Sequence, residues 1–224
     1  MPPISPGYQP PTSEPGAPAA QAPHYAGLHP AFQHNTFLIR RKVLTLFGAQ
    51  LHVYSASMQL LLYVKMKAFK LKEDITIFTD ESMSQPLIRI RARQILDISA
   101  VYDIYDVSTG AEHKLGALKR KGLKSMLRDE WEIWNQHDQP VGLIQEESGA
   151  LALVRRFIDL ARLFLPQQYN FSINGHPMGY MKQTLNPFVM KMTADFSQDT
   201  NGYLDRRMAS AAATLLCVIE GKQK

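Results

Sequence analysis

A twelve-residue apolar segment, Met208–Ile219, lies near the C-terminus and constrains the fold more than any other part of the sequence. Asp205 is placed to cap the start of a helix here, and Gly221 is placed to end it. A helix that is apolar almost all round must be surrounded on every side. A helix that spans a bilayer needs about 20 residues, so this one is too short. The segment therefore predicts a helix inside a protein core and not a membrane anchor.

The chain ahead of this segment has the pattern of many short β-strands. In one example, Leu51, Val53 and Ser55 alternate with His52 and Tyr54, which places the two sets on opposite faces of a strand. About a dozen such runs follow one another without βαβ alternation, which indicates an antiparallel sandwich or barrel. The predicted strands are residues 36–47, 50–55, 59–67, 74–79, 87–92, 98–106, 113–119, 130–135, 141–146, 168–173, 176–182 and 188–195.

Two local signals refine this arrangement. Asn174-Gly175 stands between two predicted strands and is a strong signal for a two-residue hairpin turn. Residues 149–165 have apolar side chains at helical spacing, with Arg155, Arg156 and other charged residues on the opposite face, and Pro166 ends the run. The sequence thus predicts one amphipathic helix inserted among the strands.

The N-terminal segment differs in composition from the rest. Residues 1–30 hold nine of the fourteen prolines, and such a segment cannot bury enough apolar surface to fold. We expect a disordered tail over residues 1–34 and one folded domain over residues 35–224. Pro3–Pro6 and Pro15–Pro18 match the P-x-x-P spacing that protein partners recognise. A tail of this kind could hold a protein partner or could serve only as a tether.

Several functional classes are disfavoured. The sequence has no recognisable nucleophile, phosphate-loop or zinc motif, so we expect no enzyme activity and no cofactor. Its single cysteine, Cys217, lies in the apolar segment and indicates a reducing location, and no secretory signal is visible. We therefore expect a cytoplasmic protein that contacts membranes, if at all, from the outside.

The order of the elements resembles the tubby C-terminal-like superfamily, which includes the LURP-one-related proteins and the phospholipid scramblases. The resemblance rests on the stretches 36–43, 65–72, 75–80, 102–106 and 115–121, and most specifically on Leu204–Ala209 ahead of the Ala-rich helix. It implies a mainly β fold: a closed antiparallel barrel of about twelve strands around the C-terminal helix. Unlike scramblases, the chain has one cysteine and a charged C-terminal end. Lipid scrambling needs a hydrophilic path through a bilayer, and no segment is expected to span one, so no scramblase activity is predicted.

The charge distribution suggests where a ligand would bind. Residues 40–128 carry sixteen Lys and Arg against eight Asp and Glu, whereas residues 129–224 carry nine against eleven. Such a bias favours anionic partners, although solvated strand faces would read the same way. The predicted lipid- or phosphate-binding residues are Lys119, Arg120, Lys121, Lys124, Arg89, Arg91 and Arg93.

Our leading hypothesis is a non-enzymatic domain that associates with anionic phospholipid or a membrane surface. The alternative is a protein-interaction or regulatory scaffold without a lipid role, and nucleic-acid binding is disfavoured. The resemblance to scramblases also draws attention to an acidic region before the helix. A turn and a helix cap explain this region better than a calcium loop does. The weak calcium candidates are Asp195, Asp199, Asn201 and Asp205.

Overall fold

The computed structural model describes residues 27–45, 48–67, 75–94, 100–121, 129–147, 166–184 and 190–220. Within these ranges the chain forms twelve strands, one short 3-10 helix and one α-helix. The helices are η1 (Pro30–Phe32) and α3 (Arg206–Glu220). The strands are β1 (Thr36–Thr45), β2 (Gly48–Tyr54), β3 (Leu60–Lys67), β4 (Ile75–Phe78), β5 (Pro86–Gln94), β6 (Val101–Asp106), β7 (His113–Arg120), β8 (Glu130–Asn135), β9 (Pro140–Glu146), β10 (Gln168–Ile173), β11 (His176–Thr184) and β12 (Met190–Asp195).

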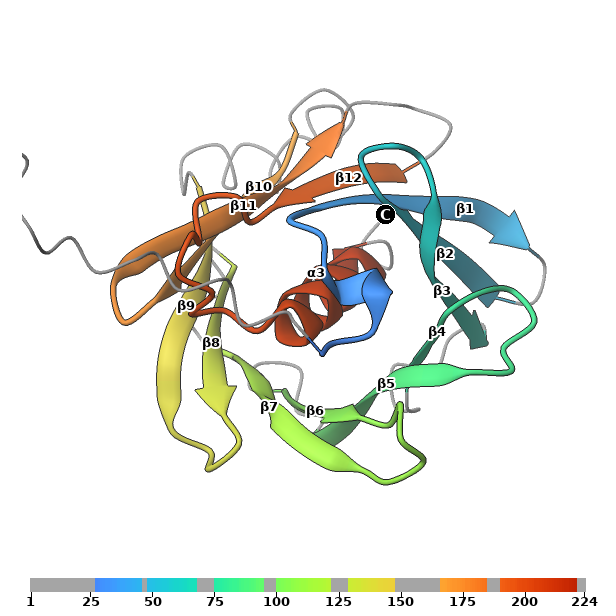
Figure 1. Ribbon diagram of the computed structural model, residues 1–224. Coiled ribbons are helices and arrows are strands. Elements are labelled where there is room, and N and C mark those ends of the chain that lie inside the picture. Colours follow the sequence, from blue (N-terminus) through green and yellow to red (C-terminus); the bar gives the residue numbers. More distant parts are fainter. Residues whose placement is uncertain are drawn as a thin grey trace, which may run out of the picture.

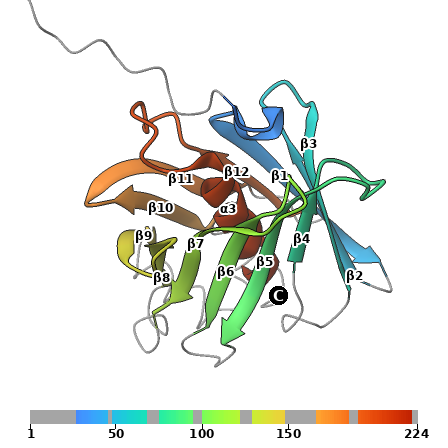
Figure 2. The ribbon, with the colours of Figure 1, turned by 60° about the horizontal axis from the view of Figure 1, so that its bottom comes forward.

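The strands form a single closed barrel. Each strand pairs antiparallel with its neighbours in sequence, and β1 pairs with β12 to close the ring. In the closing pair Thr36 lies opposite Asp195, and Arg40 lies opposite Lys191. Figure 1 looks along the barrel and shows α3 inside it, and the turned view in Figure 2 shows the strands surrounding the same helix. The predicted closed antiparallel barrel is confirmed.

The alternation of apolar and polar residues along a strand corresponds to an alternation of buried and exposed side chains. In β2, Leu51 and Val53 point into the core and are at most 1% exposed, whereas His52 and Tyr54 on the other face are partly exposed. The predicted hairpin turn is also present. Asn174 and Gly175 join β10 to β11 with φ values of 48° and 82°, and this turn needs positive φ at both residues.

The central helix α3 fills the barrel. None of the side chains from Met208 to Ile219 is more than 7% exposed, although Ser210 and Thr214 are polar. Asp205 caps the start of the helix, because its Oδ1 accepts a hydrogen bond from the backbone N–H of Arg207 at 2.8 Å. The prediction of a buried helix with an Asp cap is confirmed. No helix in the part of the chain described here is long and apolar enough to span a membrane.

Two residues ahead of residue 35, the expected start of the folded domain, pack into the core. Ala31 and Phe32 of η1 are 4% and 1% exposed and pack into the core, and Figure 1 shows η1 in front of α3. Residues 1–26 of the expected tail and the expected amphipathic helix at 149–165 lie outside the described residues. Because α3 fills the interior of the barrel, a binding site is expected among the outward-facing side chains of the strands.

Candidate anion-binding surface

The predicted row of arginines on β5 lies on the outside of the barrel, as its alternation with Ile88 and Ile90 indicated. Two of these arginines share one carboxylate. Glu112 Oε1 lies 2.5 Å from Nη1 of Arg89 and 3.1 Å from Nη2 of Arg91. The chain therefore supplies its own anion between two guanidinium groups that we had expected to bind phosphate.

The third arginine of this row belongs to a separate network. Arg93 donates a hydrogen bond from Nε to Asp103 at 2.8 Å and another from Nη2 to Asp138 at 2.7 Å. Lys114 contacts the same two carboxylates at 3.3 Å and 2.7 Å. Hydrogen bonds to Asp103 and Asp138 raise the pKa of Arg93 above its ordinary value. Two cations and two carboxylates balance here, so the network carries little net charge.

The predicted cluster at the end of β7 is paired in the same way. Lys119 lies 3.9 Å from Glu132, and Arg120 lies 2.8 Å from the buried carboxylate of Asp129. Lys121 lies 2.6 Å from Glu130, and hydrogen bonding to Glu130 raises the pKa of Lys121. These carboxylates belong to β8, which pairs with β7 in the barrel, or to the residue before β8.

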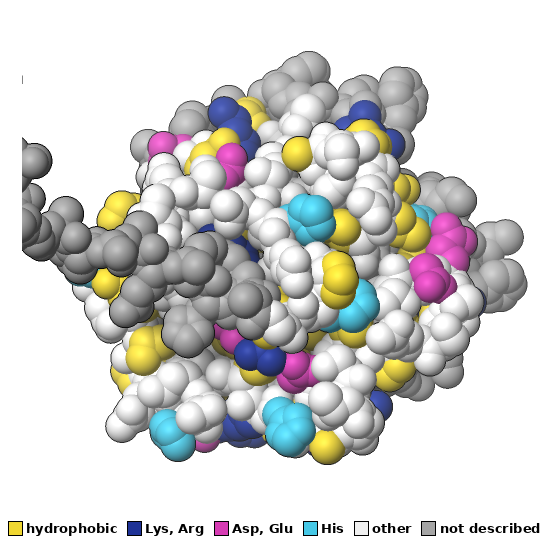
Figure 3. Space-filling model, viewed as in Figure 1, with side chains coloured by type: hydrophobic (Ala, Val, Ile, Leu, Met, Phe, Trp, Pro, Cys, Tyr) yellow, Lys and Arg dark blue, Asp and Glu magenta, His cyan; other side chains and the backbone are white. Residues whose placement is uncertain are grey.

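Six of the seven predicted cations thus have carboxylate partners, and Lys124 lies outside the described residues. On the end of the barrel seen in Figure 3, Lys and Arg are scattered among Asp and Glu and form no continuous patch. Exposed ion pairs are weak, so pairing alone does not prevent these residues from binding phosphate. Their role in lipid binding remains a prediction.

The acidic residues before α3 have structural partners. Asp199 forms a buried ion pair with Arg206, and Asp195 accepts hydrogen bonds from the backbone and hydroxyl of Ser197. Asp205 caps α3, and Asn201 is an exposed turn residue. Across the described ranges, no group of three or more His, Cys, Asp or Glu side chains is arranged to hold a metal ion.

A different set of cations shares the outer face of β1, β12 and β11. Arg40 on β1 lies directly opposite Lys191 on β12, and Lys182 on β11 lies opposite Thr193 of β12. Within the described part of the chain, none of these three cations has a carboxylate partner. The guanidinium of Arg40 lies 5.3 Å from the ring centroid of Tyr54. We call Arg40, Lys182 and Lys191 the outer basic face.

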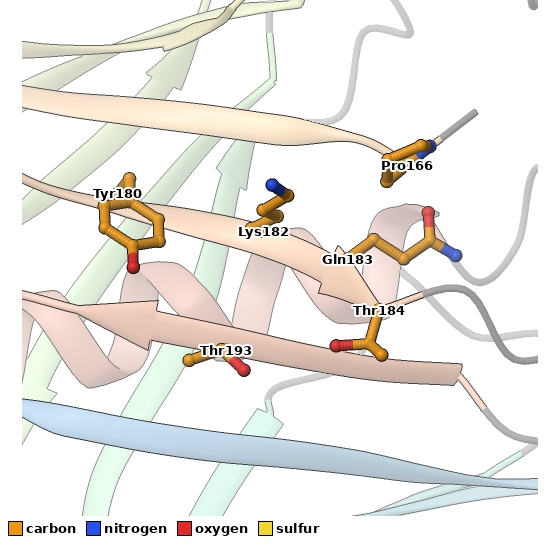
Figure 4. A pocket seen from close by; sticks show the side chains of 6 residues that line it. All are labelled: Pro166, Tyr180, Lys182, Gln183, Thr184 and Thr193. Carbon is orange, nitrogen blue, oxygen red and sulfur yellow. The ribbon is translucent and has the colours of Figure 1, made fainter.

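A hollow of about 480 Å³ lies beside this face, at the end of β11. Figure 4 shows its lining from outside the barrel, with α3 behind the strands. Three of the lining side chains carry hydroxyl groups, and one carries the ammonium group of the outer basic face. The lining residues are Pro166, Tyr180, Lys182, Gln183, Thr184 and Thr193. The composition of the hollow suits an anion that can accept hydrogen bonds.

Sequence reasoning missed this surface because its parts are far apart along the chain. Arg40 belongs to the first strand, whereas Lys182 and Lys191 belong to the last two. Only the closure of the barrel through β1 and β12 brings them together. Alternation within each strand does place each of the three on an outer face, and that signal becomes useful once the strand order is known.

A closed twelve-strand barrel filled by its own C-terminal helix is the architecture of the tubby-like domains. The sequence model of the LURP-one-related proteins matches residues 60–181, more than half of the chain, so the chain belongs to the LURP-one-related family.

One solved structure has a similar fold, the X-ray structure of an Arabidopsis thaliana protein. It is 12% identical to this chain with a TM-score of 0.46, and the match covers 88% of this chain and 97% of that one. No curated protein matches the sequence.

Proposed function

We propose that the protein is a non-enzymatic domain that associates with anionic phospholipid surfaces, and that the outer basic face makes the contact. The observation that carries the proposal is the contrast between two kinds of cation. The described cations of the predicted clusters are paired with carboxylates of the same chain, whereas Arg40, Lys182 and Lys191 have no carboxylate partner among the described residues. Cations without partners lose no ion pair when they meet a lipid headgroup.

The arrangement of the barrel supports the non-enzymatic part of the proposal. α3 occupies the axis of the barrel, where barrels of other kinds hold small ligands. Binding is therefore expected on the outer surface. A cation near an anionic membrane surface contributes about 1 kcal/mol, so three cations together support a reversible, salt-sensitive association.

The test is co-sedimentation of the full chain with neutral and with anionic vesicles at low and moderate salt. We expect binding to anionic vesicles only, weakened by salt. Replacement of Arg40, Lys182 and Lys191 together by Gln should weaken binding by about 100-fold. The matched control is Arg89→Gln with Arg91→Gln, which removes two cations that share the carboxylate of Glu112.

The control also tests the original prediction. Binding lost only in the Arg89 and Arg91 variant would move the contact to the predicted cluster on β5. If the wild-type protein binds neither kind of vesicle, the lipid hypothesis is wrong and the scaffold hypothesis takes its place.

A further inference from the structure

We infer that the hollow at the end of β11 is a binding site for a phosphate monoester. The inference rests on the proposed function, because it names the headgroup chemistry that the outer basic face would meet. A lipid headgroup and a free phosphate ester offer the same chemistry, and the experiment below separates them.

The residues around the hollow form a compact pattern on two adjacent strands. Lys182 lies opposite Thr193, and Thr184 lies opposite Lys191, so ammonium and hydroxyl groups alternate at the corners of a rectangle. Directly opposed side chains are about 5 Å apart and next-but-one residues along a strand about 7 Å apart. Figure 4 shows Tyr180, Lys182 and Thr184 along β11 and Thr193 on the neighbouring β12. These dimensions allow one phosphate group to contact several corners at once.

The polar groups around the hollow have few partners among the described residues. The hydroxyls of Tyr180, Thr184 and Thr193 make no hydrogen bond to any other residue that the structure describes, and neither ammonium group has a carboxylate partner there. These side chains point outward, because the intervening Met181 and Met192 are buried at no more than 1% exposure. No described residue therefore competes with an anion for these donors.

The neighbouring strand adds an electrostatic reason for an anion to bind here. Arg40 lies directly opposite Lys191, and like charges in that position destabilise a sheet. The guanidinium of Arg40 instead lies over Tyr54 on the next strand, at 5.3 Å from the ring centroid. A bound anion would reduce this repulsion and attract the guanidinium of Arg40 toward the hollow.

The donors favour a monoester over a diester. A phosphate monoester carries a charge of about −1.5 to −2 at pH 7 and offers three acceptor oxygens. A phosphodiester carries one negative charge and leaves two such oxygens free. The ammonium group of Lys182 and three hydroxyls line the hollow, and Lys191 lies opposite Thr184 beside it, so these donors match the higher charge and the larger number of acceptors.

The experiment compares vesicles that contain phosphatidate, a monoester, with vesicles that contain phosphatidylserine at matched surface charge. We expect the wild-type protein to bind phosphatidate vesicles about tenfold more tightly. The double variant Thr184→Val with Thr193→Val keeps the shape and the charge but removes two hydroxyls. It should lose this preference while its binding to phosphatidylserine vesicles stays unchanged.

A soluble arm uses glycerol 3-phosphate, with dimethyl phosphate as the diester control, and follows the melting temperature of the full chain. A rise with the monoester alone supports the hollow, and its loss in the double variant locates the site. Equal binding of wild type to both vesicles without a response to glycerol 3-phosphate would overturn the inference and leave the proposed function standing. A response to glycerol 3-phosphate without any vesicle binding would instead retain the hollow as a site for a free ester and overturn the membrane role.

Discussion

The guanidinium of Arg206 lies 2.8 Å from the carboxylate of Asp199, and both side chains are completely buried. The remaining donors of Arg206 are satisfied by Asn35 and by the backbone carbonyls of Phe196 and Leu204. This single side chain therefore ties the start of α3 to the entry of β1 and to the loop after β12. Arg206 lies within the core because Asp199 supplies its counter-charge there.

Asp199→Asn should destabilise the protein by about 3–5 kcal/mol, because it leaves the buried charge of Arg206 without a counter-charge. The measurement is urea unfolding followed by the fluorescence of Trp131 and Trp134. Glu112→Gln is the control, because it breaks an exposed pair and should change stability by less than about 1 kcal/mol. A similar loss of unfolding free energy in the two variants would show that the Asp199–Arg206 pair contributes no more to stability than an exposed ion pair does.

Leu216→Asp should prevent folding, because the side chain of Leu216 is 1% exposed and no described cation could pair with an aspartate at that depth of the core. The same result is expected for Ala212→Asp on the same helix. Circular dichroism and the cooperativity of thermal unfolding provide the measurement. Leu216→Met is the control, because it nearly conserves volume and should cost less than about 1.5 kcal/mol. A soluble Leu216→Asp variant that unfolds cooperatively would contradict the central position of α3.

Thr214 is a polar residue for which the structure gives no compensating contact. Its side chain is fully buried, and its Oγ1 has no hydrogen-bond partner among the described residues. Thr214→Val keeps the shape and removes the unsatisfied hydroxyl, so we expect it to stabilise the protein by about 1 kcal/mol. Thr214→Ser is the control, because it keeps the hydroxyl and removes a methyl group, which should destabilise. A lower melting temperature for Thr214→Val would indicate that the hydroxyl does have a partner.

Much of this fold could be predicted because its signals are local. Alternation such as that of Leu51 and Val53 fixes the inward face of a strand, and the Asn174-Gly175 pair fixes a turn. The apolar helix had to be surrounded by other elements, and the predicted strands were numerous enough to form a barrel around it. These signals depend only on neighbours in sequence, so they can be recognised without knowledge of the tertiary structure.

The candidate site could not be predicted because pairing depends on contacts across the barrel. The sequence shows Arg89 and Arg91 as an alternating row, but only the fold places Glu112 between them. It also gives no sign that Lys191 lies opposite Arg40. An alternating run of Lys and Arg in the sequence therefore identifies the outer face of a strand. It does not show which of these cations lack a carboxylate partner.

Asp106 makes stability dependent on pH. Burial raises the pKa of Asp106, but hydrogen bonds from Ser108 and the ion pair with Arg207 at 2.7 Å outweigh it and hold the pKa below its ordinary value. A carboxyl whose pKa is lowered by folding contributes stability that is present above the unfolded pKa of about 3.9 and is lost as pH falls through the folded pKa. This contact joins the end of β6 to the first turn of α3, so acid should loosen the helix from the barrel.

Asp106→Asn should therefore be less stable than wild type by about 1–2 kcal/mol at pH 7, and this difference should shrink as pH falls below about 4. The measurement is urea unfolding of both proteins across pH 2–7. Arg207→Gln provides a graded control, because it removes the ion pair but leaves the two hydrogen bonds from Ser108, so it should keep part of the pH dependence. If the gap between wild type and Asp106→Asn stays constant down to the lowest pH, then Asp106 does not titrate with a lowered pKa. The link between β6 and α3 would then owe its stability to hydrogen-bond geometry and not to charge.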